Sequence, residues 1–333
     1  MRMRAAQYDR YGGPEVLEVR TVEVPSPGLH EMLVRVHASG LNPKDSLVRT
    51  GALRPLSGWR FPRGTGFDFA GEVVRAGGGI DDLAPGARVW GFLDGYLGGA
   101  AADYLTAPRK WMSVMPEHLD WIEAGAMPLV ATTALQALRD VGRLASGERL
   151  LIKGASGGVG SAAIQIGAIR GAHVTAMARG DGVEYCRSLG AHEVVAYRQI
   201  DPTRFRDRFD VFLDCVGRSP VRAYRRLLRP RGRWVTVAPS LPVYSLAPLS
   251  PLSRVFGWPR FSFVAVKPLQ SDLEELARLV DGGLLRMPVT GTFPLEEIRA
   301  AHSLVAKRHG RGKRVIVVSP IAAADVTRGS VRR

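Results

Sequence analysis

The fold is decided by residues 149–179, RLLIKGASGGVGSAAIQIGAIRGAHVTAMAR. An apolar strand at 149–154 meets a glycine turn, and a helix over Val159–Arg170 leads to a second strand at 173–178. The turn reads A-x-G-x-x-G from Ala155. In such a turn the backbone approaches a pyrophosphate, and the next helix points its free N–H groups at it. The segment predicts dinucleotide binding, with a purely structural glycine turn as the alternative.

The turn supplies the expected cofactor contacts. Gly157 allows the close approach, and Gly160 lets helix and strand pack tightly. Ala155 departs from the glycine that usually holds the first position. The residues that we expect to contact the cofactor here are Ala155, Ser156, Gly157, Gly158, Val159 and Gly160.

The end of the second strand favours NADP(H) over NAD(H). An acidic residue there usually binds the ribose hydroxyl of NAD, whereas an arginine suits the additional phosphate of NADP. The strand ends at Ala178 and is followed by Arg179, which can pair with a phosphate through two N–H groups. In the alternative, Arg179 caps a solvated loop and Asp181 binds the ribose.

Outward from this segment, strands and helices alternate. Strands are expected at 193–197, 209–217 and 232–238, with helices at 183–190 and 221–228. This alternation predicts βαβ units in a doubly wound parallel sheet, a Rossmann domain of the α/β class. The first 125 residues are β-rich, with period-two runs at 32–39 and 71–76. The last strand, Lys313–Val318, is expected to rejoin that first domain. The predicted limits are 1–125, 126–264, 265–320 and a flexible tail at 321–333.

Composition narrows the class of protein. The 333 residues carry a net charge of +15 and two cysteines, and no apolar stretch is long enough to span a membrane. Two cysteines do not build a disulfide scaffold, and the N-terminus lacks the apolar core of a secretory signal. A cytoplasmic protein is expected. The arginines are dispersed and no nucleic-acid-binding motif accompanies them, so a solvated basic surface is favoured over a polyanion site.

The sequence resembles the medium-chain dehydrogenase/reductases, in particular their zinc-independent quinone oxidoreductase branch. The resemblance covers nearly the whole chain, and besides the glycine turn it includes SGLNPKDSLVRTG (39–51), PRGTGFDFAGEV (62–73), SLGAHEVVAY (188–197) and GRGKRVIVV (310–318). It implies a GroES-like β-rich barrel domain beside the Rossmann domain, and a homodimer. It also implies hydride transfer from NADPH to a small-molecule quinone or α,β-unsaturated carbonyl, and an apolar compound is expected.

The resemblance also implies that no metal is bound. Where zinc-dependent relatives carry the first cysteine, this chain reads Ala38-Ser39-Gly40-Leu41-Asn42, and where they carry a His-Glu pair, it reads Gly66-Phe67-Asp68. Ser39 and Asp68 do not make a tetrahedral zinc site. Without a Lewis acid, alcohol oxidation loses its usual route, and an acceptor that is already electron-poor is favoured.

Further site residues follow from the resemblance. Asn42 is expected beside the nicotinamide, with an ordinary turn start as its alternative, and Lys44 and Asp45 complete the expected catalytic group. Thr132 is expected at the nicotinamide end, or it caps a helix. Tyr197 and Lys313 are expected near the cofactor. Their alternatives are a half-buried strand aromatic for Tyr197 and a solvated chain end for Lys313. The proton donor stays open among Tyr96, Tyr104, Lys44 and water.

The proline-rich segment 239–264 has two interpretations. Its apolar side chains, with Arg254 and Arg260 among them, suit a lid over a bulky substrate or a peripheral membrane contact, and packing at a dimer interface is the alternative. Two other functions are considered. One is a non-catalytic NADPH-binding protein whose basic surface contacts RNA or a membrane, and the other is an enoyl-thioester reductase. No specific nucleic-acid partner is predicted.

Overall fold

The chain forms two compact units in this computed structural model. The first unit comprises Met1–Leu129, Lys267–Gly283 and Met287–Arg333, and the second comprises Val130–Val266 and Leu284–Arg286. The structure describes residues 1–200, 205–217, 219–238, 257–306 and 310–319, together with residues 245 and 248. No helix of this described part combines the length and apolarity that crossing a membrane requires.

The first unit is built on β-strands, as the period-two runs predict. Met32, Val34, Val36 and Ala38 alternate along one strand and are fully buried. The larger sheet has the order β15-β16-β3-β5-β6-β8, with β7 also paired to β3, and the smaller has the order β2-β1-β4. The strands are β1 (Arg2–Tyr8), β2 (Glu18–Glu23), β3 (Glu31–Gly40), β4 (Arg63–Gly64), β5 (Asp68–Ala76), β6 (Arg88–Phe92), β7 (Tyr104–Pro108), β8 (Met112–Val114), β15 (Val289–Pro294) and β16 (Lys313–Val317).

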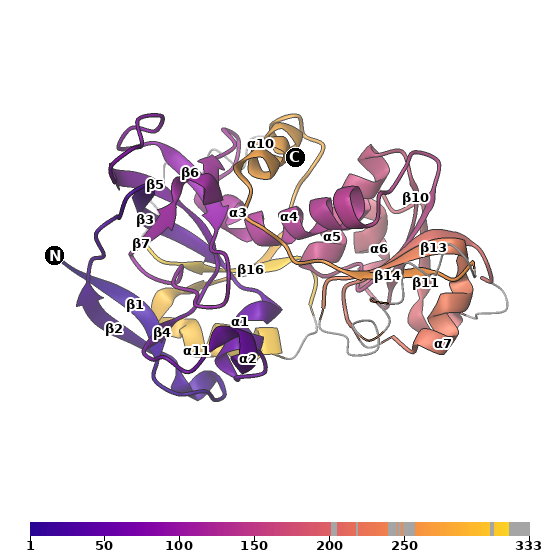
Figure 1. Cartoon of the computed structure of the whole chain (residues 1–333), viewed down its shortest axis with the longest axis horizontal. Helices are drawn as coiled ribbons and strands as arrows, with labels where there is room; N and C mark the ends of the chain where they lie inside the picture. Colours follow the sequence, from indigo (N-terminus) through magenta and orange to yellow (C-terminus); the bar gives the residue numbers. More distant parts are fainter. Residues whose placement is uncertain are drawn as a thin grey trace. The chain divides into compact units, whose positions relative to one another are not determined.

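The C-terminal strand β16 pairs antiparallel with β3, so the last strand rejoins the N-terminal sheet as predicted (Figure 1). Ile316 lies opposite Ser39, and Val315 lies opposite Gly40. This register brings the start of β16 to the carboxyl end of β3, where the chain turns into its first helix. Two segments that are far apart in the sequence therefore meet at one corner of the sheet.

In the described residues the first unit contains the α-helices α1 (Pro43–Arg49), α2 (Arg54–Ser57), α3 (Trp121–Ala126), α10 (Gln270–Asp281) and α11 (Ile298–Ala306). Asp120 caps α3 by accepting a hydrogen bond from the Glu123 N–H at 2.7 Å. A Cβ on Gly125 of α3 would lie 2.8 Å from the Cβ of Ala38 in β3. The glycine is therefore required for the close approach of this helix to the sheet.

The second unit is an α/β Rossmann domain with a six-stranded parallel sheet in the order β11-β10-β9-β12-β13-β14. The strand order reverses between β9 and β12, which puts the topological switch point at their carboxyl ends. Phe212 and Trp234 pack edge-to-face in its core at 4.8 Å between ring centroids. The strands are β9 (Arg149–Lys153), β10 (His173–Ala178), β11 (Glu193–Ala196), β12 (Phe209–Asp214), β13 (Leu228–Thr236) and β14 (Arg260–Phe263). The helices are α4 (Pro128–Gln136), which begins in the first unit, α5 (Gly158–Ile169), α6 (Gly182–Ser188) and α7 (Val221–Tyr224).

Several predicted elements differ in extent. The helix expected over 221–228 is α-helical only to Tyr224 (α7) and continues as a 3-10 turn over Arg225–Leu227, after which β13 begins at Leu228. Residues 260–263, expected in a lid or contact segment, form the edge strand β14, which pairs with β13 and buries Phe261. Residues 239–244, 246–247 and 249–256 of that segment, and the tail 321–333, lie outside the described residues.

The predicted domain limits stay predictions, and they do not include one short segment of the second unit. Leu284–Arg286 belong to the second unit although they stand inside the C-terminal segment. The Gln165 side chain explains this placement. It donates to the Arg286 carbonyl oxygen at 2.8 Å and accepts from the Arg286 N–H at 3.0 Å.

Candidate functional site

The glycine turn lies between β9 and α5, where the sequence placed it. Gly154 has a φ of +78°, and Gly157 is the N-cap of α5. A Cβ on Gly160 would lie 2.6 Å from the Cα of Ala155, so helix and turn pack too closely for any side chain. A Cβ on Gly157 would meet only the Gly154 carbonyl oxygen, at an ordinary 3.4 Å. Packing within the chain therefore requires glycine at 160 but not at 157.

Tyr197, in the turn that follows β11, is bound to the same glycine turn. The Gly154 N–H donates to the Tyr197 hydroxyl oxygen at 2.9 Å. Burial raises the pKa of Tyr197, and this bond and the charge of Arg179 oppose the rise. Tyr197 begins a turn after β11 and is not a strand residue. Arg179, immediately after β10, is exposed, and Asp181 is the N-cap residue of α6. A cation and a phenol therefore lie at the ends of two adjacent strands, next to the turn.

Thr132 lies in the middle of α4, so it caps no helix end. Its side chain is buried, and its hydroxyl has no hydrogen-bond partner among the residues that the structure describes. A buried hydroxyl without a partner is uncommon in native proteins and needs an explanation such as a bound ligand or water. The predicted cofactor contact at Thr132 would supply one.

Asn42 and Asp45 form the N-terminal cap of α1 in the first unit. The Asn42 N–H donates to Asp45 Oδ2 at 2.7 Å, and the Gly66 N–H donates to Asp45 Oδ1 at 2.9 Å. Both side chains are buried. Burial raises the pKa of Asp45 to about 6, and the two backbone bonds and the charge of Lys313 oppose this rise. Asp45 thus holds the loop in place through backbone donors.

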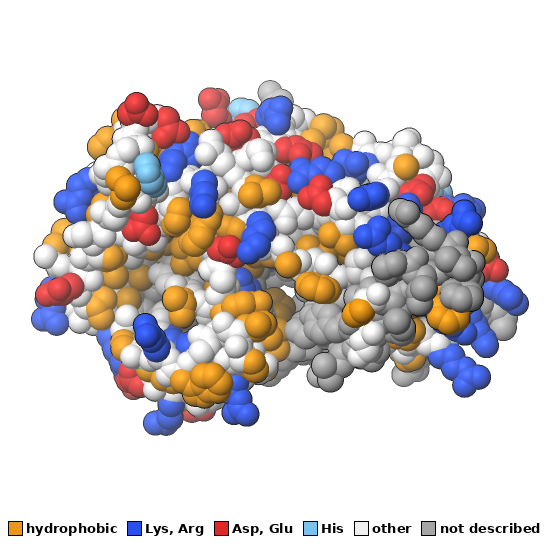
Figure 2. Space-filling view, viewed as in Figure 1, with side chains coloured by type: hydrophobic (Ala, Val, Ile, Leu, Met, Phe, Trp, Pro, Cys, Tyr) orange, Lys and Arg blue, Asp and Glu red, His pale blue; other side chains and the backbone are white. Residues whose placement is uncertain are grey.

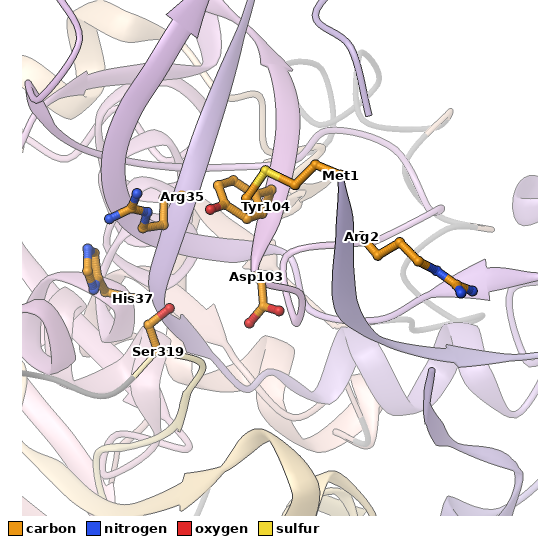
Figure 3. A pocket seen from close by; sticks show the side chains of 7 residues that line it. All are labelled: Met1, Arg2, Arg35, His37, Asp103, Tyr104 and Ser319. Atoms are coloured by element: carbon orange, nitrogen blue, oxygen red, sulfur yellow. The ribbon is translucent and has the colours of Figure 1, made fainter. Parts of the chain in front are cut away.

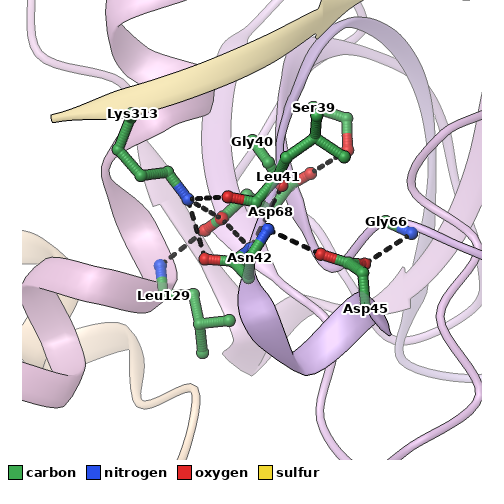
Figure 4. Close-up of polar contacts among 9 residues, drawn as sticks. All are labelled: Ser39, Gly40, Leu41, Asn42, Asp45, Gly66, Asp68, Leu129 and Lys313. Carbon is green, nitrogen blue, oxygen red and sulfur yellow. Dashed lines mark hydrogen bonds and ion pairs between the residues drawn. The ribbon is translucent and has the colours of Figure 1, made fainter. Parts of the chain in front are cut away.

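Lys313, Asp68 and Asn42 form a buried polar network beside that cap (Figure 4). The Lys313 ammonium, on β16, donates to the Leu41 carbonyl oxygen at 2.8 Å, to Asn42 Oδ1 at 2.7 Å and to Asp68 Oδ2 at 3.3 Å. The Asn42 amide donates to Asp68 Oδ2 at 2.7 Å and to the Gly40 carbonyl oxygen at 3.1 Å. The Leu129 N–H, at the start of α4, donates to Asp68 Oδ1 at 2.6 Å.

This network uses every donor that it contains. A lysine ammonium has three protons and an asparagine amide has two, and each of these has an acceptor within the chain. Burial raises the pKa of Asp68, and the Lys313 charge opposes that rise. Asn42 is therefore held in one orientation, and in this geometry its amide keeps no N–H for a substrate.

Lys44 lies outside the network. Within the described residues its ammonium has no hydrogen bond or ion pair, and it lies 4.0 Å from the ring centroid of Phe67 and 5.4 Å from that of Tyr96. Burial lowers the pKa of Lys44. Two of the proton-donor candidates, Lys44 and Tyr96, are thus neighbours.

Tyr104 is in a different place. It lines a cavity of about 410 Å³ together with Met1, Arg2, Arg35, His37, Asp103 and Ser319 (Figure 3). Asn42, Asp45 and Lys44 do not line this cavity. The structure therefore separates Tyr104 from the residues expected to act in catalysis.

Comparisons with known proteins identify the family of this chain. The family described as "Alcohol dehydrogenase GroES-like domain" matches residues 28–117, and that described as "Zinc-binding dehydrogenase" matches residues 189–316. A chloroplast envelope quinone oxidoreductase homolog of Arabidopsis thaliana is 30% identical over 331 residues, which cover 96% of this chain and 98% of the relative. The chain belongs to the medium-chain dehydrogenase/reductase superfamily.

Two further relatives of this dehydrogenase/reductase extend the match. The mitochondrial NAD(P)H oxidoreductase RTN4IP1 of Mus musculus is 32% identical over 357 residues, covering 95% of this chain and 89% of the relative. The solved quinone oxidoreductase of Coxiella burnetii is 28% identical, with a TM-score of 0.87, and the match covers 96% of this chain and all of that one. The chain is an oxidoreductase that uses a nicotinamide cofactor and a small-molecule substrate.

The superfamily includes zinc enzymes, but the residues here do not fit zinc. The Ser39 hydroxyl donates to the Asp68 carbonyl oxygen at 2.8 Å, and the Asp68 carboxylate is held by the Lys313 ammonium, the Asn42 amide and the Leu129 N–H. Among the described residues, no group of three or more His, Cys, Asp and Glu side chains is arranged to hold a metal. A zinc ion beside Asp68 would have to displace an ammonium that already compensates this carboxylate.

Sequence reasoning missed part of the polar site of this dehydrogenase/reductase. It treated Asp68 only as a poor zinc ligand, although Asp68 is the carboxylate that pairs with Lys313. In the second unit it missed Lys153 and Asp214, which end β9 and β12 at the switch point. Asp214 Oδ1 accepts from the N–H groups of Val216 and Gly217, and Oδ2 is buried with no hydrogen bond among the described residues. Polar residues at the ends of two buried strands were the available signal.

Proposed function

We propose that this chain transfers a hydride from NADPH to a quinone or an α,β-unsaturated carbonyl without a metal ion. The observation that carries the proposal is the Lys313 ammonium, which neutralises Asp68 where zinc relatives need a ligand. Because this cation is covalently part of the chain and fully hydrogen-bonded inside it, it is not available to polarise an alcohol. The acceptor must then be electron-poor by itself, as quinones and enones are.

When bound, NADPH supplies the hydride. The chain binds its pyrophosphate at the glycine turn, where Gly157 leaves space that packing within the chain does not require. The Asp45 cap and the Asn42 amide fix the backbone from Gly40 to Asp45. This rigid backbone holds the first-unit part of the site in one geometry.

Lys44 is the proposed proton source. Reduction of a quinone to its hydroquinone adds one hydride, which NADPH gives up as it becomes NADP⁺, and one proton from another donor. Burial lowers the pKa of Lys44, so its ammonium gives up a proton more readily than an ordinary lysine. Among the described residues its contacts are ring faces and not acceptors, which leaves its N–H groups free to face a substrate oxygen.

NADPH is proposed over NADH because of the residues beyond β10 and β11. The exposed guanidinium of Arg179 can pair with the phosphate on the adenosine ribose, and the Tyr197 hydroxyl can donate its proton to the same group. Asp181, two residues after Arg179, could bind an unphosphorylated ribose instead. The balance between these two side chains decides the cofactor.

The cofactor proposal is tested by the dissociation constants of NADPH and NADH. We expect wild-type protein to bind NADPH more tightly, and Arg179→Ala to weaken NADPH binding about tenfold or more while leaving NADH nearly unchanged. Asp181→Ala is the matched variant and should not weaken NADPH binding. Tighter binding of NADH by the wild type would contradict the proposal.

The reaction is tested by the rate of NADPH oxidation with a panel of small quinones, enones, enoyl thioesters and secondary ketones. Quinones or enones should support turnover and ketones should not. Lys44→Met should lower kcat at high pH. The decrease should be smaller for quinones than for enones, because water can protonate a hydroquinone anion. Turnover restricted to unactivated ketones would refute the proposal.

A further inference from the structure

The segment from Gly51 to Pro62, between α1 and β4, exposes apolar side chains to an unusual degree. Leu56, in α2, is 64% exposed and Trp59 is 67% exposed. Pro55 and Pro62 are exposed as well. In Figure 2, hydrophobic side chains gather over α1 and α2, and Lys or Arg side chains lie at the edge of this area. Leu56 and Trp59 therefore extend into solvent and are not part of the core.

This exposed segment is nevertheless fixed by buried groups. Arg63 is 3% exposed, and its guanidinium donates to the Ser57 carbonyl oxygen at 2.6 Å, the Gly58 carbonyl oxygen at 2.8 Å and the Arg60 carbonyl oxygen at 2.8 Å. These three acceptors belong to residues before and after Trp59 in the chain. A loop whose backbone is held on both sides of an exposed tryptophan presents that side chain in a fixed place.

Tyr11 strengthens the same arrangement. Its hydroxyl donates to the Gly58 carbonyl oxygen and lies 3.2 Å from Ser57 Oγ. The Arg63 guanidinium lies over the rings of Tyr11 and Phe61 at 5.5 Å and 5.2 Å from their centroids. Tyr11 and Arg63 thus fix the backbone of the segment that carries Leu56 and Trp59, although these two side chains are themselves mostly exposed to solvent.

The charged residues that neighbour Leu56 and Trp59 in the sequence are all arginines. No Asp or Glu occurs from Ser46 to Phe67. Arg54 and Arg60 flank the pair and are exposed, and neither has an ion pair within the described part of the chain. On the adjacent strand end, Asp9 is exposed but is paired with Arg20 at 2.5 Å.

We propose that this element, residues 51–62, docks the protein on a membrane surface that contains anionic lipids. Tryptophan prefers the interface between headgroups and hydrocarbon, and leucine gains from burial there. Arginines beside them are attracted to anionic headgroups. A second copy of the chain fits less well, because a symmetric contact through this element would bring the arginines of both copies together.

The inference is tested by co-sedimentation of the full chain with vesicles, without cofactor or substrate, so its outcome is independent of the proposed reaction. Vesicles of phosphatidylcholine alone are compared with vesicles containing phosphatidylglycerol. We expect binding to the anionic vesicles, and a loss of about tenfold in partitioning for the double variant Leu56→Ser/Trp59→Ser. Arg54→Gln/Arg60→Gln should weaken binding and flatten its dependence on salt. Leu29→Ser is the control, since Leu29 is 72% exposed elsewhere in the first unit and should have no effect.

Quenching by brominated lipids locates the contact. Trp59 and Trp258 are both exposed, at 67% and 52%. Trp59→Phe should remove most of the quenching and Trp258→Phe should not. The proposal is overturned if the wild type does not bind anionic vesicles, if the Leu56/Trp59 variant binds as well as the wild type, or if the quenching depends on Trp258. Concentration-dependent dimerisation that Trp59→Ser abolishes, without vesicle binding, would assign the element to a second copy instead.

Discussion

Lys313 and Asp68 show how single residues set the chemistry of this site. Their side chains are almost completely buried, and each satisfies the other through a contact of 3.3 Å and shared bonds to Asn42. Burying one charge alone costs several kcal/mol, so the pair is stable only when both members are present. The ammonium thereby makes a buried carboxylate tolerable next to α1.

Removing one member of this pair should be costly. We expect Lys313→Met to lower the free energy of unfolding by about 3–5 kcal/mol, because Asp68 then remains buried without its cation. Lys267→Met is the matched control. Lys267 pairs with Asp94 at 3.3 Å but is 62% exposed, so its loss should cost at most about 1 kcal/mol. Urea denaturation measures both, and equal effects would refute the internal role of Lys313.

Asp45 should leave a signature in the pH dependence of stability. Burial raises its pKa from 3.8 to about 6, so the folded state holds this proton more tightly than the unfolded chain. Its contribution to stability is therefore complete below pH 3.8 and is lost as pH rises through about 6.

Asp45→Asn should remove that part of the pH dependence. We expect the difference in unfolding free energy between wild type and variant to change between pH 4 and 6 and to be level above about pH 7. A series of urea titrations at these pH values measures it. A difference that is constant across the range would show that Asp45 does not titrate as stated.

At the junction of β9 and α5, one glycine is needed for packing and another is available for cofactor binding. Gly160 is required by the fold, because its Cβ would lie 2.6 Å from the Ala155 Cα, whereas a Cβ on Gly157 meets nothing closer than 3.4 Å. Two glycines of one motif thus have different physical reasons. Their positions in the motif predict this division, with Gly157 assigned to the approach of the cofactor and Gly160 to packing.

Alanine at each position should separate the two roles. Gly160→Ala should destabilise the protein by about 1–3 kcal/mol through overpacking. Gly157→Ala should change stability by less than about 1 kcal/mol but weaken the binding of NADPH, because the methyl group occupies the space of the pyrophosphate. Thermal unfolding and NADPH titration of both variants check this. Unchanged cofactor affinity in Gly157→Ala would contradict the expectation.

The elements that sequence could predict are those with local signals. The glycine turn, the alternation of strands and helices and the period of β3 all lie in short windows, and the structure confirms them. The edge strand β14 was missed because Arg260–Phe263 follows a proline-rich run, and its strand character comes from pairing with β13. The helical segment that begins at Val221 was predicted to within one residue, because it runs to Leu227 and β13 begins at Leu228.

The candidate site was predictable only in part. Asn42 and Asp45 lie three residues apart and form a local cap, so a motif could indicate them. The bond between Lys313 and Asp68 joins residues that are 245 positions apart. No sequence window contains both, and they meet because β3 pairs with β16 on one side and with β5, which begins at Asp68, on the other. Sequence therefore indicated Lys313 as a residue near the cofactor but not its acceptors.

For the whole molecule, charge and chemistry point in one direction. A net charge of +15 attracts a phosphorylated cofactor and anionic surfaces over a distance that salt shortens. Docking through residues 51–62 would place a first-unit site close to acceptors dissolved in a membrane, if the proposed reaction holds. The basic charge, the docking element and the buried Lys313 cation would then all contribute to the proposed reaction.

The metal-free reaction that we propose rests on the Lys313 ammonium, which neutralises the buried Asp68 carboxylate. The measurement that tests it most directly is the steady-state rate of quinone reduction by NADPH after exhaustive treatment with a zinc chelator, with the metal content of the same sample determined by elemental analysis. We expect an unchanged rate and no stoichiometric zinc. Loss of turnover on chelation, restored by added zinc, would contradict it.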